Sequence, residues 1–118
     1  MRHREVCLLI GRDGEVLWSD ASDSAVSLPD SRARWEAVWR LREELEEIAH
    51  SHPLGPLGFS PEDETTMEAL LLALGQPVRF SVVAPEGTLV REYGQDRLRA
   101  EEPAWTAELR ARSGMATA

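Results

Sequence analysis

Two short apolar runs separated by a tight polar turn open the chain. Residues 5–10 are almost wholly apolar, and a second apolar stretch at 15–19 follows the turn Gly11-Arg12-Asp13-Gly14. An Asp-Gly pair between two such runs is typical of a β-hairpin, so we predict two paired strands here. The next stretch, residues 19–30, is rich in serine and aspartate and has no period, which indicates a loop.

Residues 31–45 have the spacing of an amphipathic helix. Either Asp30 or Ser31 can cap its N-terminus. Its apolar positions recur at intervals of three and four residues: Trp35, Val38, Trp39, Leu41 and Leu45. This pattern predicts one buried face, with both tryptophans in the core, and a solvated face opposite.

A short strand and a second helix are predicted next. The strand spans residues 48–52 and ends at Pro53, and the Gly- and Pro-rich stretch 54–59 forms a loop. Ser60, Pro61 and Glu62 together are typical of a helix start, with a cap, a proline at the first position and an acid in the first turn. The helix is expected to end at Gly75. Its inward-facing residues would be Met67, Leu70, Leu71 and Leu74.

The last third of the chain predicts a second hairpin and a third helix. Apolar runs at 78–84 and 88–93 flank the turn at 85–87, and residues 103–112 form a helix with Trp105 and Leu109 on one side. We assign residues 1–112 to a single domain and expect residues 113–118 to fray. The order of the elements predicts an α+β fold, in which a central mixed β-sheet is flanked by helices.

Composition and charge narrow the classes of function. With 118 residues, of which 42% are hydrophobic and 29% charged, the chain has the make-up of one globular domain. Its 13 basic and 21 acidic residues give a net charge of −8, which argues against nucleic acid or an anionic membrane surface as a partner. The lone Cys7 excludes an internal disulfide, and no apolar run approaches the ~20 residues of a membrane span, so we expect a cytoplasmic protein.

Two histidines on the predicted third strand are candidate metal ligands. His50 and His52 are two residues apart, so strand alternation directs both imidazoles to one face. The loop then turns back and places Asp63 in the first turn of the next helix. Two imidazoles and one carboxylate form a three-ligand set, and catalytic zinc sites with such a set keep the fourth position for water. A His-x-His pair alone is more often a surface or packing feature, but the downstream acid and serine favour the metal interpretation.

The same segment resembles the signature of the JAMM metalloproteases of the MPN-domain superfamily. That signature consists of an upstream Glu, then His-x-His, ten intervening residues and an Asp, with a Ser three positions before the Asp. Here His50-Ser51-His52 is followed by Ser60 and Asp63, with residues 53–62 as the ten spacers. The order of predicted strands and helices is also similar to that family over most of the chain, in a minimal form like that of its bacterial members.

The resemblance implies a role for each member of the motif. His50, His52 and Asp63 would hold one Zn²⁺, and Ser60 would help the metal to stabilise the oxyanion of a tetrahedral intermediate. A serine at that position is also a helix cap, and the two roles are compatible. Glu5 would be the general base.

The assignment of Glu5 depends on the first strand. Residues 5–7, Glu-Val-Cys, lead to a glycine at 11 and look like the first core strand of bacterial family members, one residue shorter. Glu15 is the alternative base. Glu46 and Glu47 are interpreted as surface acids before the metal-bearing strand.

The chain departs from the family at its start. The family usually has a helix before the first core strand, and only four residues precede Glu5 here. Without a cover, that face of the sheet would expose a sizeable apolar patch. We expect the segment around Trp105 and Leu109, or a second subunit in a homodimer, to cover it.

The activity implied by the resemblance is hydrolysis of a peptide or isopeptide bond at the C-terminal tail of a ubiquitin-like or sulfur-carrier protein. Three alternatives stay open. One is a non-enzymatic MPN scaffold that binds zinc and holds protein partners. The second is the RadC-like branch, which typically has Asn where this chain has Ser51. The third is a peptidase for short peptides or cell-wall fragments.

Overall fold

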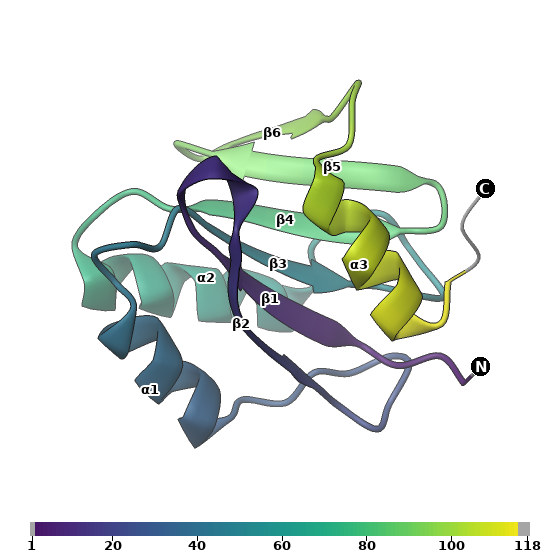
Figure 1. Ribbon diagram of the computed structural model, residues 1–118, viewed down its shortest axis with the longest axis horizontal. Coiled ribbons are helices and arrows are strands. Elements are labelled where there is room, and N and C mark those ends of the chain that lie inside the picture. Colours follow the sequence, from purple (N-terminus) through teal and green to yellow (C-terminus); the bar gives the residue numbers. More distant parts are fainter. Residues whose placement is uncertain (1, 116–118) are drawn as a thin grey trace.

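A six-stranded mixed sheet forms the centre of the molecule (Figure 1). This computed structural model describes residues 2–115. The strands are β1 (Val6–Ile10), β2 (Val16–Ala21), β3 (Glu47–Ser51), β4 (Arg79–Ala84), β5 (Gly87–Glu92) and β6 (Gln95–Leu98). Their order across the sheet is β2-β1-β3-β4-β5-β6, and each neighbouring pair is antiparallel except β3 and β4.

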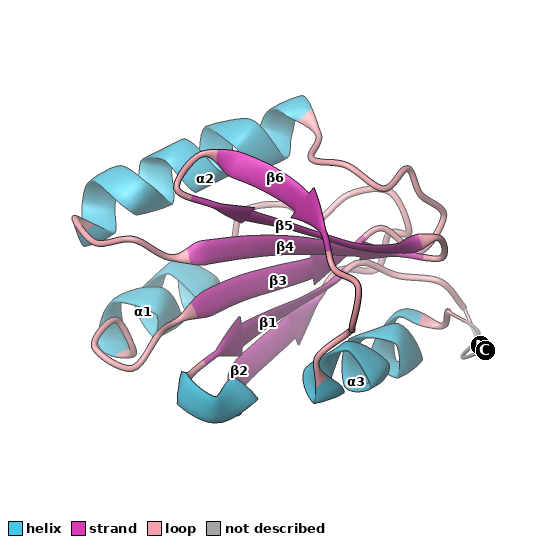
Figure 2. Cartoon of the chain, turned by 90° about the horizontal axis from the view of Figure 1, so that it is seen from above, coloured by secondary structure: helices cyan, strands magenta, loops and turns pink. Residues whose placement is uncertain are grey.

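Helices pack on both faces of the sheet (Figure 2). The helices α1 (Arg32–Arg40) and α2 (Pro61–Leu74) lie on one face, and α3 (Ala104–Ser113) lies on the other. Side chains of β1 alternate between the two cores, with Cys7 and Leu9 packed beside α1 and α2, and Val6 and Leu8 packed beside α3. The predicted α+β fold is confirmed. Among residues 2–115, no helix combines the length and apolar character needed to cross a lipid bilayer.

The caps of α2 explain why the chain turns back after β3. The Ser60 side chain accepts a hydrogen bond from the Asp63 amide, and the Asp63 side chain accepts one from the Ser60 amide, which completes a capping box. Pro61 occupies the first turn, and Gly75 ends the helix at a φ of 63°. The helix therefore carries the chain from β3 to the parallel strand β4, a connection that parallel strands require.

The third helix covers the sheet face that carries Val6, Leu8 and Ile10. Trp105, Leu109 and Met115 are buried against Val6, Leu8, Ile10, Ala49 and Val83. The predicted burial of Trp105 and Leu109 is confirmed. The end of the chain departs from the expectation of fraying at 113–118, because Ser113 belongs to α3 and both Ser113 and Met115 are buried. Residues 116–118 lie outside the described part of the chain.

Two predicted core positions in the first two helices are exposed. Trp39 is 53% exposed, with the Arg42 guanidinium 4.2 Å from its ring centroid, and Leu71 is 40% exposed. Each follows directly after a buried residue, Val38 or Leu70, and successive helical residues differ by about 100° in direction. The helix α1 is also shorter than predicted, because it ends at Arg40.

The interpretation of Glu47 as a surface acid is wrong. Glu47 is the first residue of β3, between β1 and β4, and is 2% exposed. Glu46 is partly exposed and lies 3.6 Å from Arg12.

The sequence did not predict the strand β6. Its four residues are all exposed, so it lacks the apolar alternation that predicts a strand. It forms because Tyr93 and Gly94, at φ values of 51° and 74°, make a tight turn from β5.

Candidate metal centre

The register of the sheet brings the predicted ligands and the predicted base to one face. In the antiparallel ladder of β1 and β3, Cys7 lies opposite His50. Continuing this register by two residues places Glu5 opposite His52. Because Cys7 faces the core formed with α1 and α2, His50, His52 and Glu5 are directed to that face by alternation. The main chain of His52 is held just beyond β3 by a 2.8 Å hydrogen bond to the Val83 carbonyl.

The capping box of α2 supplies the third ligand. Asp63 Oδ2 accepts a 2.8 Å hydrogen bond from the Ser60 amide, which fixes the carboxylate at the start of the helix. This same oxygen lies 3.1 Å from His50 Nε2 and 3.3 Å from His52 Nε2. The positive end of the helix dipole further favours a carboxylate at this position. One local motif therefore both starts the helix and aims a ligand.

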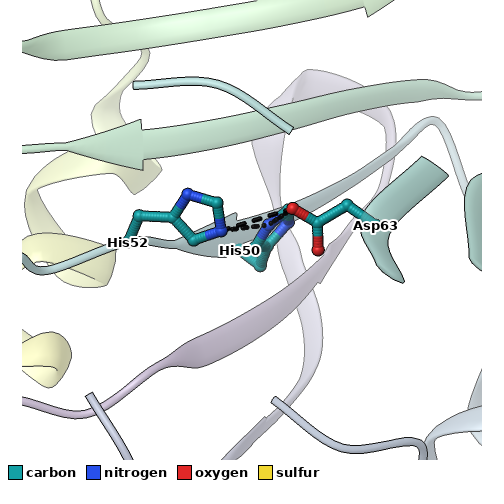
Figure 3. Close-up of side chains that lie close together, drawn as sticks. All are labelled: His50, His52 and Asp63. Atoms are coloured by element: carbon teal, nitrogen blue, oxygen red, sulfur yellow. Dashed lines mark hydrogen bonds and ion pairs between the residues drawn. The ribbon is translucent and has the colours of Figure 1, made fainter. Parts of the chain in front are cut away.

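The three ligand atoms form a small triangle (Figure 3). His50 Nε2 and His52 Nε2 are 3.2 Å apart, and both lie within 3.3 Å of Asp63 Oδ2. Among the described residues, these three are the group of histidine and acidic side chains whose ligand atoms could hold a metal ion. The prediction that His50, His52 and Asp63 converge is confirmed.

Hydrogen bonding prepares two of the ligands for a cation. His52 Nδ1 lies 3.1 Å from the Pro56 carbonyl, which can only accept, so Nδ1 carries the proton and Nε2 keeps its lone pair for a metal. Burial would raise the pKa of Asp63, but hydrogen bonds with His50 and His52 outweigh it and hold that pKa well below its usual range. Asp63 is therefore an anion at neutral pH, as a metal ligand must be.

Glu5 lies beside this triangle, immediately before β1. Its side chain is buried, with 4% of the residue exposed, and it lines a cavity of about 530 Å³ together with His52, Ser60 and Asp63. Residues 26–30 also line the cavity. Burial raises the pKa of Glu5 from 4.5 to about 7, with His52 acting against it and the nearby Asp63 and Glu62 adding to it.

Of the other residues considered from the sequence, Glu15 lies away from the metal centre, Cys7 is buried in a strand, and Ser60 lies at the centre. Glu15, the alternative base, is exposed at the far end of the β1–β2 hairpin, where the register places it away from His50. Cys7 is a buried strand residue, as expected, and burial raises the pKa of its thiol to about 12. Ser60 caps the helix and also lines the cavity, so its position is compatible with both predicted roles, helix cap and oxyanion donor.

Several contacts of the centre could not be found from sequence patterns. The Pro56 partner of His52 is a main-chain carbonyl, which any residue would supply. Phe59 packs with its ring centroid 6.2 Å from that of His50, and the Arg91 guanidinium lies 4.7 Å above the Phe59 ring. Arg91 itself is held by Glu64 and Asp96. Arg91 lies 27 residues beyond Glu64 in the chain, so no local sequence pattern links the two.

Comparison with known proteins leaves the motif without an independent family assignment. A scan against protein-family models found no match for this chain, and a search of the curated proteins found no matching sequence. The likeness to the JAMM metalloproteases stays a prediction from the residues at 50–63 and from Glu5.

Proposed function

We propose that this protein is a zinc metallopeptidase that hydrolyses a peptide or isopeptide bond at the C-terminal tail of a ubiquitin-like or sulfur-carrier protein. The observation that carries the proposal is the triangle of His50, His52 and Asp63, together with Glu5, which lines the same cavity as His52 and Asp63. In catalytic zinc sites three protein ligands leave the fourth position to water, and a nearby carboxylate can accept the proton of that water.

The donor set supports a first-row divalent metal ion. Ligands at about 2.0–2.2 Å from a tetrahedral zinc ion are about 3.3–3.6 Å from one another, slightly more than the separations of 3.1–3.3 Å observed here. Two histidines and one carboxylate also suit Fe²⁺. Zinc is the proposed ion because the adjacent base fits hydrolysis, to which Zn²⁺ contributes by lowering the pKa of water from 15.7 toward about 7.

Glu5 is the proposed general base. Its carboxylate accepts the proton of the attacking water and later delivers it to the leaving amine. A pKa of about 7 suits this exchange, because the group can both take and release a proton near neutral pH.

Ser60 is the proposed oxyanion donor. Its Oγ accepts a hydrogen bond from the Asp63 amide, so the hydroxyl proton stays available for donation into the cavity that Ser60 lines. Donors of this kind contribute about 2.7–4 kcal/mol to the stabilisation of the transition state in other hydrolases.

The substrate class and the cellular compartment are supported by sequence features. The motif resembles that of JAMM enzymes, whose substrates are ubiquitin-like tails, and a peptide in extended conformation can bind along an exposed strand edge. The net charge of −8 favours a protein tail over nucleic acid or an anionic membrane surface. The lone Cys7 is consistent with the cytoplasm.

A panel of C-terminal fusions to ubiquitin-like and sulfur-carrier proteins tests the proposal. Glu5→Gln should keep one zinc ion per chain and reduce kcat by a factor of about 10²–10⁴, the usual contribution of a general base. His52→Ala should lose both zinc and activity. Glu15→Gln, which changes an exposed glutamate, is the matched control and should behave as the wild type.

Two results would contradict the proposal. Full activity of Glu5→Gln would assign the base to another residue. Zinc binding by the wild type without cleavage of any fusion would favour the alternative of a zinc-binding scaffold that holds protein partners.

A further inference from the structure

We infer that Ser113, at the end of α3, is a positioning residue for Glu5, and that it acts through Ser51 and the main chain of Val6. The inference rests on the proposed role of Glu5 as general base. It gives a function to the serine between the two histidines, which the metal centre itself does not use.

Three hydrogen-bonding groups join β1, β3 and α3 behind the metal centre. The Val6 amide donates a 2.9 Å hydrogen bond to Ser51 Oγ, and Ser51 Oγ lies 2.6 Å from Ser113 Oγ. Ser113 Oγ is also 2.7 Å from the Leu109 carbonyl. Because a carbonyl can only accept, the Ser113 proton goes to Leu109 and the Ser51 proton goes to Ser113. The result is one directed chain from Val6 to the helix.

Strand alternation explains why this chain reaches the catalytic face. Ser51 points away from His50 and His52, toward α3, and is completely buried. Val6 likewise faces α3 and is the residue next to Glu5, whose side chain faces the cavity. A hydroxyl on one face of the sheet therefore fixes the backbone that carries a carboxylate on the other face.

Further contacts fasten the preceding residues to the same end of α3, beside which β1 begins (Figure 1). The Arg4 amide donates to the Ser113 carbonyl at 3.2 Å, and Arg4 Nε donates to the Arg112 carbonyl at 3.1 Å. Gly114 has a φ of 78°, and a Cβ at this position would lie 2.7 Å from the Arg2 carbonyl oxygen. The segment before Glu5 and the end of α3 are therefore in direct backbone contact.

The position of Glu5 depends on its backbone. None of the described residues makes a hydrogen bond with the Glu5 carboxylate. Glu5 also lies one residue before the start of β1. On one side its amide and carbonyl pair with Ser24 and Ser22. On the other side the Val6 amide is held by Ser51 and Ser113. Loss of the Ser113 hydroxyl leaves the buried Ser51 proton without its acceptor and loosens this second side.

Ser113→Ala tests the inference in the full chain, with Thr106→Val as the matched control. Thr106 is on the same helix, is 1% exposed, and its Oγ1 has no hydrogen-bond partner among the described residues. Ser113→Ala should keep zinc stoichiometry and KM and lower kcat by roughly ten- to a hundredfold, because displacement of a reacting group by about 1 Å has effects of that size. Thr106→Val should retain the wild-type kcat.

Amide hydrogen exchange provides a readout that does not need activity. The Val6 amide should exchange at least about tenfold faster in Ser113→Ala than in Thr106→Val. Ser113→Cys keeps a weak donor in nearly the same volume, so its Val6 exchange rate should lie between those of the other two variants. It replaces Ser113→Ala if the alanine variant fails to fold.

The outcomes separate this inference from the proposed function. Equal Val6 exchange in the serine variants and the control, or loss of zinc from folded Ser113→Ala or Ser113→Cys, would overturn the inference. A wild type that binds zinc and cleaves no fusion would overturn the proposed function and with it the catalytic part of the inference. Faster exchange of the Val6 amide would then still establish that Ser113 restrains the main chain of Val6.

Discussion

Strand β3 has a cluster of polar and charged side chains at each end, and arginines neutralise the acid of only one of them. At its start, Glu47 is bound by Ser81 Oγ and lies 2.9 Å from Arg99 and 3.4 Å from Arg79. At its end, the Asp63 carboxylate and two imidazoles converge on one point, and Glu5 has no hydrogen-bond partner for its carboxylate among the described residues.

The difference identifies which cluster is suited to binding an ion. The arginines supply the cations that Glu47 needs, so the first cluster is complete within the chain. The second cluster offers lone pairs and negative charge to a cation that the protein does not supply. The volumes of the adjoining cavities do not distinguish the two clusters, since the cavity beside Glu47 is about 700 Å³ and the one beside Glu5 about 530 Å³. The chemistry of the lining side chains is what differs.

The largest expected effect is the loss of metal binding in Asp63→Asn. Asparagine can still accept the hydrogen bond from the Ser60 amide, so the helix start is preserved while the anionic ligand is lost. Changes in the partners of metal ligands already reduce affinity 10–100-fold, so loss of a ligand's charge should exceed about 100-fold. Competition with a chelating dye would measure the zinc affinity. A variant that loses zinc only because its melting temperature falls below the assay temperature would not support this view.

This ligand set is the part of the molecule that local sequence determines best. His50 and His52 are placed by strand alternation, and Asp63 by a capping box, so their convergence follows from residues within one short segment. Glu5 reaches the same face through the register between β1 and β3, whereas the sequence indicated it only through the resemblance of residues 5–7 to a known first core strand.

The opposite end of β3 could not be predicted in the same way. The burial of Glu47 depends on Arg79 and Arg99, which lie 32 and 52 residues further along the chain. The link from Ser51 to Ser113 spans 62 residues. No periodicity encodes such pairs, because they arise only once the sheet has formed and α3 has packed on it. The strand β6 was not predicted for a different reason, since its four exposed residues show no apolar alternation.

The next largest effect should come from Glu47→Gln, which removes the anion between two arginines. Arg99 would keep a buried charge, since only 10% of its side chain is exposed. Breaking a buried ion pair by removing one partner lowers the free energy of unfolding by about 3 kcal/mol or more. Denaturant unfolding would measure this loss, and zinc stoichiometry should stay unchanged. Loss of zinc in the folded variant would show that the two ends of β3 are coupled.

The smallest effect should have the opposite sign, because Glu5→Gln should stabilise the metal-free protein at neutral pH. The folded chain holds the Glu5 proton more tightly than the unfolded chain, so the stability associated with this proton is complete below pH 4.5 and is lost as the pH rises through about 7. Glutamine is uncharged throughout and avoids that loss. The difference in melting temperature between variant and wild type, measured with a chelator present, should therefore be small at pH 4.5 and grow toward pH 8. Glu15→Gln controls for the removal of one negative charge from the chain. A Glu5→Gln difference that stayed constant over this range, or that matched the destabilisation by Glu47→Gln, would mean that the Glu5 carboxylate is already neutralised by the protein and is not held ready for a proton.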